Sequence, residues 1–242
     1  MKAIIFAAGL GTRLQPLTLN KPKALVKING ITLLELAIQK LTHHGFTDII
    51  INVHAFGTQI IEFVSQHSFD ARISISDERN LLLDTGGGLA KALHFFSDGE
   101  PFLAYNVDII TSVDLGKFYK QHLIQRPLAS LMVRKRNTSR YLLFDREMNL
   151  SGWKNISNGE EIWVNGTEAT TEEFAFSGIH IVDPRISKYI KTENTPFPIM
   201  PFYLDIAKHE PIKGVIDKDS VWFDVGKLEQ LKEAEKFLSM GC

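Results

Sequence analysis

The most constraining feature of this sequence is its opening, where a short apolar run passes directly into a glycine-rich turn. Residues 3–8 are apolar throughout and include β-branched side chains, which is typical of a strand buried on both faces. Gly9 and Gly11 follow, and glycine lets a backbone turn tightly and lets an anion approach its N–H groups. Three cations stand close by in the chain: Arg13, Lys21 and Lys23. Together these features predict a site for several phosphate groups.

Two common phosphate-binding motifs do not match this turn. The dinucleotide fingerprint requires a third glycine three residues after the second, and Leu14 stands at that position. The P-loop ends in Gly-Lys followed by Ser or Thr, a sequence that this stretch lacks. What remains is the pattern G-x-G-T-R-x-x-P-L-T, followed by K-P-K at residues 21–23.

Segments with strand and helix patterns alternate through the first half of the chain. The predicted strands cover residues 3–8, 48–53, 71–76 and 102–105, and the predicted helices cover 32–41, 58–67 and 89–96. Thr32 and Glu35 have the spacing of a capping box, which marks the start of the first helix. The β-α-β-α-β-α-β order predicts a parallel sheet with helices on both faces.

The second half has more strands and fewer helices. Strands are predicted at 128–134, 141–144, 150–153, 174–182, 211–215 and 220–224, and helical segments at 183–190, 202–208 and 227–240. No linker separates the halves and no further domain follows the last helix, so we expect one domain spanning residues 1–242. The expected fold class is α/β, a Rossmann-like α/β/α sandwich with a mixed, mainly parallel central sheet.

Composition excludes several classes of function. The formal net charge of −1 provides no overall basic field for nucleic acid or an anionic membrane, so any anion site must be local. No apolar stretch approaches the roughly 20 residues that a membrane-spanning helix needs, and the N-terminal run has no signal-peptide pattern. The single cysteine, Cys242, cannot form an internal disulfide. We therefore expect a cytoplasmic protein, and its oligomeric state stays open.

Two further stretches carry residues suited to phosphate chemistry. Asp84 and Thr85 precede the three glycines at 86–88. Because each glycine loses much backbone entropy on folding, such a run is expected where backbone lies flat against a ligand. Asp108 follows the predicted strand 102–105, and ligands of an open parallel sheet bind at the carboxyl ends of its strands. A carboxylate there suits a divalent cation on a triphosphate, although a lone aspartate after a strand is more often a turn or cap residue.

Several polar residues leave their roles open. Asp224 ends a predicted strand within the sequence Trp-Phe-Asp-Val-Gly. Glu173 precedes the predicted strand 174–182, where a solvated acid and a ligand-binding acid are equally consistent with the pattern. Asn52 and His54 stand at the end of the second predicted strand, where each could line a pocket or make a local hydrogen bond.

These stretches resemble the motifs of the sugar-1-phosphate nucleotidyltransferases, the enzymes that make nucleoside-diphosphate sugars. The match covers the opening G-x-G-T-R-x-x-P-L-T loop with its trailing K-P-K, the D-T-G-G-G stretch, Asp108 and W-F-D-V-G. It departs after Gly226, where Lys227 and Leu228 replace the Thr-Pro that is common in the family. The resemblance implies the nucleotide-diphospho-sugar transferase type of fold, with a nucleotide-binding half at 1–125 and a sugar-binding half, carrying the second metal ligand, at 126–242.

The resemblance also implies roles for individual residues. Arg13, Lys23 and Asp108 are the expected catalytic residues, and Asp108 and Asp224 are the expected ligands of Mg²⁺. The remaining assignments are to nucleotide binding (Ala8, Gly9, Gly11, Thr12, Arg13, Asp84, Gly86 and Gly87) and to sugar binding (Asn106, Glu173 and Gly178).

The implied reaction joins an NTP and a sugar-1-phosphate to give an NDP-sugar and pyrophosphate, by a Mg²⁺-dependent in-line displacement at the α-phosphate. An acidic residue before T-G-G-G is similar to what uridylyl- and guanylyltransferases have, so UTP is the first expectation and GTP the second. The short chain is similar to compact members that act on N-acetylmuramic acid-1-phosphate, mannose-1-phosphate or heptose phosphates. The nucleobase, the sugar and the pathway stay open.

Three alternatives share part of this pattern. A cytidylyltransferase acting on a phosphoalcohol would have the same loop and both aspartates. A glycosyltransferase is suggested by Asn106-x-Asp108, which is similar to the D-x-D metal motif, but an NDP-sugar has no γ-phosphate for the Arg-Lys loop to hold. A sensor that binds an NDP-sugar without turnover is disfavoured by the intact set of Arg13, Lys23, Asp108 and Asp224. Pyrophosphate release separates the glycosyltransferase and the sensor from the nucleotidyltransferases.

Overall fold

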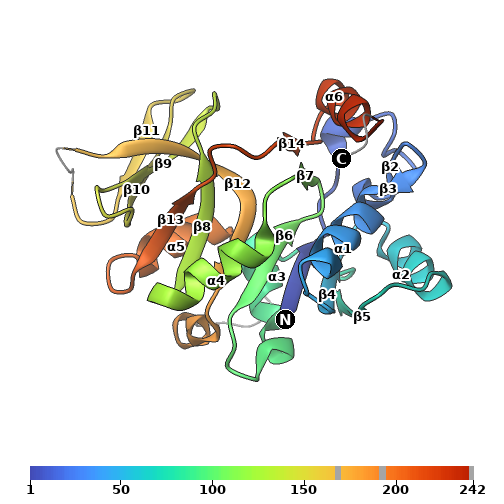
Figure 1. The fold of residues 1–242 in the computed structure, drawn as a ribbon, viewed down its shortest axis with the longest axis horizontal. Helices are drawn as coiled ribbons and strands as arrows, with labels where there is room; N and C mark the ends of the chain where they lie inside the picture. The colour runs from blue at the N-terminus through green and yellow to red at the C-terminus, as the bar shows by residue number, and fades with distance from the viewer. Residues whose placement is uncertain (167–169, 191–194, 240–242) are drawn as a thin grey trace.

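A ten-stranded mixed sheet forms the centre of the molecule (Figure 1). The computed structural model describes residues 1–166, 170–190 and 195–239. The strand order is β11-β10-β9-β12-β6-β1-β4-β5, and β8 pairs with both β12 and β13. Helices pack on both faces of this sheet, so the predicted α/β, Rossmann-like fold class is confirmed.

Four parallel strands place the candidate site residues at one edge of the sheet. They are β1 (Lys2–Phe6), β4 (Asp48–Val53), β5 (Arg72–Asp77) and β6 (Phe102–Asn106). β1 lies between β4 and β6, with Phe6 opposite Asn52 on one side and Asn106 on the other, and β5 pairs with β4. Because the four strands are parallel, the loops that follow them meet at the same edge.

One long strand, β12 (Glu172–Val182), joins the two parts of the sheet. It runs antiparallel to β6, to β8 (Ala129–Arg134) and, through its first residues, to β9 (Arg140–Phe144). The sheet continues through β10 (Leu150–Asn155) and β11 (Glu160–Trp163), while β13 (Ile212–Ile216) pairs with β8 in parallel. These strands form the left-hand part of the molecule in Figure 1.

Two apolar cores hold the helices against the two faces of the sheet. Successive residues of β1 point to opposite faces, so Ile5 belongs to one core and Ile4 to the other. The first core includes α1 (Leu33–His43), α2 (Gly57–Gln66), α4 (Leu115–Gln125) and α6 (Leu228–Ser239). The second includes α3 (Asp84–Ala92) and α5 (Ile199–Ile206). No helix in the described ranges is long and apolar enough to cross a membrane.

The remaining elements are short. There are 3-10 helices at Thr12–Leu14, Lys23–Leu25, Leu93–Phe96 and Pro184–Tyr189. Two small ladders pair β2 (Lys27–Ile28) with β3 (Ile31–Thr32), and β7 (Ile109–Thr111) with β14 (Trp222–Asp224).

The start of α1 follows from local capping chemistry, as the sequence predicts. Thr32 Oγ1 accepts a 3.1 Å hydrogen bond from the N–H of Glu35, whose carboxylate accepts a 2.8 Å bond from the N–H of Thr32. These reciprocal bonds satisfy two N–H groups that a helix start would otherwise leave unpaired. The helix boundary is therefore set by residues within one turn.

The sequence pattern misses or shifts a few elements. β7 and β11 have only three and four residues, too few to show a period. α4 is not predicted because its apolar stripe is thin, with Leu115, Phe118 and Tyr119 as its buried apolar residues. α3 begins at Asp84 rather than at the predicted residue 89, so the three consecutive glycines lie inside its first turns. The predicted end of the last helix, residue 240, lies outside the described residues.

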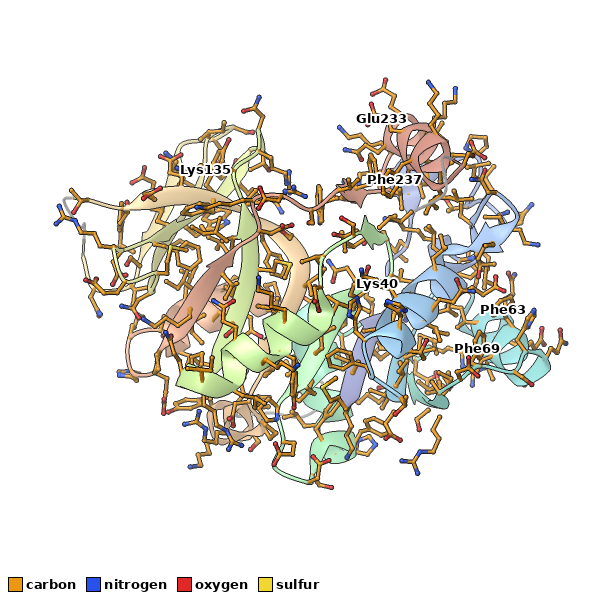
Figure 2. All side chains as sticks on the ribbon, in the orientation of Figure 1. Lys40, Phe63, Phe69, Lys135, Glu233 and Phe237 are labelled. Carbon is orange, nitrogen blue, oxygen red and sulfur yellow. The ribbon has the colours of Figure 1, made fainter. Side chains whose placement is uncertain are left out.

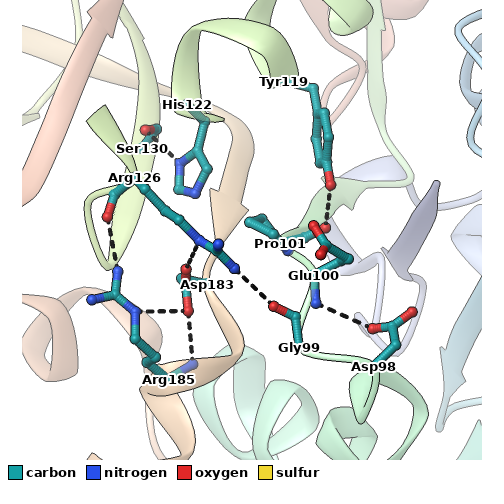
Figure 3. A network of polar contacts seen from close by, with 10 residues as sticks. All are labelled: Asp98, Gly99, Glu100, Pro101, Tyr119, His122, Arg126, Ser130, Asp183 and Arg185. Carbon is teal, nitrogen blue, oxygen red and sulfur yellow. Dashed lines mark hydrogen bonds and ion pairs between the residues drawn. The ribbon is translucent and has the colours of Figure 1, made fainter. Parts of the chain in front are cut away.

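A buried aspartate anchors the end of β12 (Figure 3). Asp183 accepts hydrogen bonds of 2.9 Å from the Nε atoms of Arg126 and Arg185. Burial alone would raise the pKa of Asp183, but the hydrogen bonds from the two arginines outweigh it and lower the pKa below its ordinary value. Nearby, His122 is bonded to Ser130, and burial lowers the pKa of His122 to about 4. The network therefore ties α4 and the segment after it to the end of β12.

The β7–β14 ladder brings the C-terminal part of the chain to the site edge. Asp224 of β14 lies opposite Ile109 of β7. α6 covers this ladder, because Phe237 packs on Phe223 with ring centroids 5.7 Å apart, whereas Glu233 on the same helix is exposed and points outward in Figure 2. The packing of α6 thus supports the short strand that carries Asp224.

Candidate active site

The carboxyl ends of β1 and β6 border a cavity of about 360 Å³. Phe6 pairs with Asn106, and the N–H of Val107 donates a 3.2 Å hydrogen bond to the carbonyl of Phe6. The two loops therefore leave the sheet side by side. The cavity is lined by seven of the predicted site residues: Gly9, Gly11, Thr12, Arg13, Lys23, Asn106 and Asp108.

The glycine loop owes its path to Gly11. This residue has a φ of +67°, in the left-handed region that favours glycine. A Cβ there would lie 3.1 Å from the Cβ of Lys23 and 3.2 Å from Cγ2 of Thr18. The N–H of Leu14 then bonds to the carbonyl of Gly11 at 3.0 Å, and Leu14 is fully buried. Gly9, in contrast, has open space where a Cβ would stand, so a ligand can come close to its backbone.

Lys23 and Asp108 form an ion pair in the wall of this cavity. Their side chains are only 10% and 18% exposed, so water screens the pair weakly. Lys23 comes from the K-P-K segment and Asp108 from the loop after β6, so the pair ties these two segments together. The cavity thus offers a cation for phosphate and a carboxylate for a counter-cation.

The structure brings Asp224 next to Asp108, although the two are far apart in the chain. The N–H of Val225, the residue after Asp224, donates a 2.9 Å hydrogen bond to the carbonyl of Asp108. Oδ1 of Asp224 is enclosed and has no hydrogen-bond partner among the described residues. Burial, and next the charge of Asp108, raises the pKa of Asp224, while Lys23 and Arg13 act in the opposite direction. Two carboxylates in this relation are suited to share a cation.

Arg13 and Asp224 approach each other beside Gly226. A Cβ on Gly226 would lie 2.8 Å from Oδ1 of Asp224 and 2.9 Å from Nη2 of Arg13. Any larger residue would push the two charged groups away from these positions. The W-F-D-V-G stretch therefore supplies both the acid and the space beside it.

A larger cavity, of about 940 Å³, adjoins the first, and Arg13 and Thr85 line both. Asp84 and Asp224 also line it. Much of its remaining wall is aromatic or aliphatic: Tyr141, Leu142, Trp153, Ile162, Phe176, Ile199 and Leu204. A cavity of this size with a few convergent charged groups suits a small organic ligand. The cavity at the glycine loop and the larger cavity thus meet at Arg13 and Thr85.

Two of the three consecutive glycines, Gly86 and Gly87, do not reach either cavity. Their N–H groups donate to the carbonyl of Phe197 at 2.9 and 3.2 Å. A Cβ on Gly86 would lie 2.3 Å from the ring of Phe197, and one on Gly87 would lie 2.5 Å from the carbonyl oxygen of Thr195. These glycines are required for packing against another segment of the chain. Gly86 and Gly87 thus pack against the segment at Phe197, whereas Asp84 and Thr85 line the larger cavity, and the expected nucleotide contact of the two glycines stays a prediction.

Asn52 joins the glycine loop to the third glycine of that run. Its Oδ1 accepts hydrogen bonds of 2.7 and 3.3 Å from the N–H groups of Ala7 and Ala8, and its Nδ2 donates a 3.0 Å bond to Glu78. A Cβ on Gly88 would lie 2.8 Å from both Asn52 Nδ2 and Glu78 Oε1. Burial raises the pKa of Glu78, and the hydrogen bond from Asn52 partly opposes this. Ala8, predicted to bind nucleotide, thus has its N–H engaged inside the protein and is not among the residues that line these two cavities.

The predicted sugar-binding residues separate into two groups. Asn106 lines the smaller cavity, and Gly178 packs against it, because a Cβ on Gly178 would lie 3.0 Å from Nδ2 of Asn106. Glu173 lines neither cavity and forms an ion pair with Lys154. Side chains alternate along β12, so Glu173 points away from the face on which Phe176 lines the larger cavity. The structure therefore places Glu173 away from both cavities, and its expected contact with the sugar stays a prediction.

Some lining residues carry no clear signal in the sequence. Arg136 and Tyr141 line the larger cavity, yet both come from the middle of the chain, where motifs are weakest. The alternation of Arg134 and Arg136 at a strand end indicates a shared face, but it does not indicate what that face meets. His54 makes a 2.7 Å hydrogen bond with the carbonyl of Glu78, 24 residues further along the chain.

Comparison with known proteins places this geometry in a family. The sequence profile described as "Nucleotidyl transferase" matches residues 2–240. The chain belongs to the nucleotidyl transferase family. Its curated relatives include the N-acetylmuramate alpha-1-phosphate uridylyltransferase of Neisseria meningitidis serogroup B, 30% identical over 238 residues, with 97% of each chain covered. The protein of the same name from Caulobacter vibrioides is 29% identical over 248 residues, covering 98% of this chain and 96% of the other.

Solved structures of other proteins have the same fold as this nucleotidyl transferase. The crystal structure of HddC from Yersinia pseudotuberculosis has a TM-score of 0.77 at 21% identity, covering 98% of this chain and 99% of that one. A UDP-glucose pyrophosphorylase complexed with UDP-glucose has a TM-score of 0.77 at 17% identity, with 100% of both chains covered. These likenesses concern the arrangement of the sheet and helices, and they agree with the α/β fold class.

Proposed function

We propose that this nucleotidyl transferase joins an NTP and a sugar-1-phosphate to give an NDP-sugar and pyrophosphate. One observation carries the proposal: Asp108 and Asp224, from opposite halves of the chain, meet where two cavities adjoin, with Arg13 and Lys23 beside them. Two relatives that match almost the whole chain are named uridylyltransferases of N-acetylmuramate-1-phosphate. UTP is therefore our first choice of NTP, GTP the second, and N-acetylmuramate-1-phosphate the first acceptor to test.

We assign the triphosphate to the smaller cavity and the sugar phosphate to the larger one. The open backbone at Gly9 and the turn at Gly11 allow phosphate oxygens to approach N–H groups. Arg13 and Lys23 balance the charge of the triphosphate at one wall of that cavity. The apolar and aromatic wall of the larger cavity suits the face of a sugar ring.

The chemical step requires positioning and charge stabilisation. A phosphate oxygen of the sugar-1-phosphate forms a bond to the α-phosphorus of the NTP, while the bond to the oxygen that bridges to the β-phosphate breaks and pyrophosphate leaves. The attacking oxygen is already an anion, so no residue needs to remove a proton. The barrier comes from bringing two anions together and from charge on the leaving group. Arg13 and Lys23 lower it by stabilising that charge.

We propose that Asp108 and Asp224 hold Mg²⁺ together with the nucleotide phosphates. Asp224 has an enclosed carboxylate oxygen without a hydrogen-bond partner among the described residues, and together with the neighbouring carboxylate of Asp108 it forms a fitting pair of ligands. The described residues contain no cluster of three or more His, Cys, Asp or Glu side chains that could hold a metal. Mg²⁺ suits two carboxylates, because it takes its remaining ligands from phosphate oxygens and water. When bound, it supplies positive charge that neutralises the phosphates.

The proposal includes the roles of the two halves of the chain. Residues 1–125 would bind the nucleotide, and residues 126–242 would bind the sugar and supply the second carboxylate, within one domain. A cytoplasmic location belongs to the same proposal, since the reaction consumes NTP.

A pyrophosphate-release assay that crosses four NTPs with a panel of sugar-1-phosphates tests the function. We expect release with UTP or GTP and one sugar phosphate, and none when the sugar phosphate is omitted. Arg13→Ala should abolish release, while Lys135→Gln, whose parent side chain is 70% exposed, should keep the wild-type rate. Binding of an NDP-sugar without release from any pair would favour a sensor. Release only with CTP and a phosphoalcohol would favour a cytidylyltransferase.

A further inference from the structure

Arg136 lines the larger cavity together with Arg13 and Arg140, and the charge of Asp224 acts on Arg136 there. Its Nη2 atom donates a 3.3 Å hydrogen bond to the carbonyl of Phe176, and its Nη1 atom donates a 3.5 Å bond to the carbonyl of Asn137. Both distances are long for a charged donor, whose hydrogen bonds are normally about 2.7–2.9 Å. Most of the hydrogen-bonding capacity of this guanidinium is therefore unused by the described residues.

Arg136 is half-buried and forms no ion pair with any of the described residues. Its Nε atom is enclosed and has no hydrogen-bond partner in the described ranges. Burial lowers the pKa of Arg136, and the charge of Asp224 only partly opposes this. Burying a cation is costly unless an anion or several acceptors compensate. The position is therefore one that an anionic ligand would stabilise.

The indole of Trp222 holds this guanidinium in place. The Cζ atom of Arg136 lies 4.7 Å from the centroid of the Trp222 ring, and Trp222 Nε1 donates a 2.9 Å hydrogen bond to the carbonyl of Ser177. A guanidinium stacked on an aromatic face keeps its N–H donors in the guanidinium plane free for an anion. Asp224 is two residues from Trp222, so the stacked arginine and the acid belong to the same part of the cavity wall.

Arg134 provides a comparison on the same indole. Its Cζ atom lies 5.4 Å from the Trp222 ring, but its Nη2 atom donates a 2.9 Å hydrogen bond to the carbonyl of Ser220. Its Nη1 atom lies 3.9 Å from Asp217, and Arg134 lines neither cavity described above. Arg134 therefore has protein partners, whereas Arg136 presents its charge to the cavity. Lys135, between them, has a side chain that is 70% exposed and pairs with Glu172.

We propose that Arg136 binds the phosphate group of the acceptor sugar phosphate and holds it beside Asp224. This inference rests on the function proposed above, in which the triphosphate occupies the smaller cavity with Arg13 and Lys23. The acceptor phosphate must then enter from the larger cavity. Arg136 lines that cavity, and its charge, like that of Arg13, acts on Asp224. The acceptor phosphate, pinned at Arg136, would be presented to the α-phosphate where the two cavities adjoin.

The test separates the two substrates. We expect Arg136→Gln to raise KM for the sugar phosphate, and its Kd measured by calorimetry without the NTP, by about 10- to 100-fold, as for loss of a charge-assisted contact. KM for the NTP should change by less than about threefold, because Arg136 does not line the triphosphate cavity. Arg136→Lys keeps a point charge but loses the planar fork, so its KM for the sugar phosphate should lie between those of the wild type and Arg136→Gln.

The matched control is Arg134→Gln, which removes the same side chain from the same indole and should leave both KM values near wild type. Thermal unfolding of each variant checks that the fold is intact, and Arg136→Lys supplies the comparison if Arg136→Gln does not fold. Equal losses for both substrates, no loss at all, or the same loss in Arg134→Gln would each overturn the role given to Arg136. Failure of the proposed function is seen separately, in the wild type, as no pyrophosphate release from any substrate pair.

Discussion

Asn52 offers a sharp test of how the glycine loop is held. Its side chain accepts hydrogen bonds from two backbone N–H groups, at Ala7 (2.7 Å) and Ala8 (3.3 Å), and donates one to Glu78 (3.0 Å). Asn52 and Glu78 are each 2% exposed, so water cannot replace these bonds without a rearrangement of the loop. Asn52→Leu keeps a side chain of similar length and removes all three bonds.

The expected cost follows from the donors that lose their acceptor. A buried donor left without a partner costs roughly 1–3 kcal/mol. Two N–H groups are affected, one strongly bonded and one weakly, and the leucine gains some apolar burial in return. We therefore expect the free energy of unfolding to fall by about 2–4 kcal/mol. The same change should raise KM for the NTP, because Ala7 and Ala8 lead directly into Gly9 at the cavity wall.

Urea unfolding followed by circular dichroism measures this change as a shift of the midpoint at unchanged slope. Asn52→Asp is the matched variant, because it keeps an acceptor for both N–H groups but places a second carboxyl beside Glu78. The free energy of unfolding of Asn52→Asp should be closer to the wild-type value at acid pH. The difference from wild type should grow as pH rises, since two adjacent carboxyls resist ionisation. An unfolding free energy for Asn52→Leu within about 0.5 kcal/mol of wild type would refute the reasoning.

Three further predictions concern the carboxylates. Asp108→Asn should lower kcat/KM for pyrophosphate release by at least about 100-fold with the far-UV spectrum unchanged, and a near-normal rate would remove Asp108 from the catalytic set. Asp183→Ala leaves Arg126 and Arg185 without their shared acceptor, so the free energy of unfolding should fall by about 3 kcal/mol, and an unchanged urea midpoint would contradict this. Burial raises the folded-state pKa of Glu78, so the unfolded chain ionises first and wild-type stability is lost as pH rises from the ordinary value of 4.5 towards the raised pKa. Glu78→Gln should therefore match wild type at low pH and gain stability relative to it near neutral pH, and a difference between the two proteins that does not change with pH would exclude this linkage.

Much of the fold is predictable because its signals are local. The predicted strand 48–53 coincides with β4, and the capping residues Thr32 and Glu35 set the start of α1 as expected. α4 and β11 are missed because their positions depend on contacts with other parts of the chain more than on their own periodicity. The start of α3 is misplaced because three glycines, which disfavour a helix in isolation, are held in one by packing against Phe197 and Thr195.

The site residues likewise divide into those that a local signal predicts and those that depend on tertiary contacts. The glycine loop with Arg13 and Lys23 is visible in one short stretch, and these residues do line one cavity. The sequence places Glu173 near the right strand, but the side of the sheet to which it points depends on strand register. Arg136 is overlooked because nothing in its neighbourhood in the chain indicates that Trp222 and Asp224 lie beside it.

By itself, the sequence determined the buried opening strand, the turn at Gly9 and Gly11 and the cations that follow, because each depends on backbone freedom or charge within a few residues. Only the tertiary structure decided that Asp224 stands next to Asp108, through a ladder of three residue pairs between β7 and β14. It also decided that Gly86 and Gly87 pack against Phe197 and Thr195. The physical reason is that a carboxylate pair, a cavity wall and a close backbone approach form between segments that are far apart in the chain. Local preferences of the chain do not specify them.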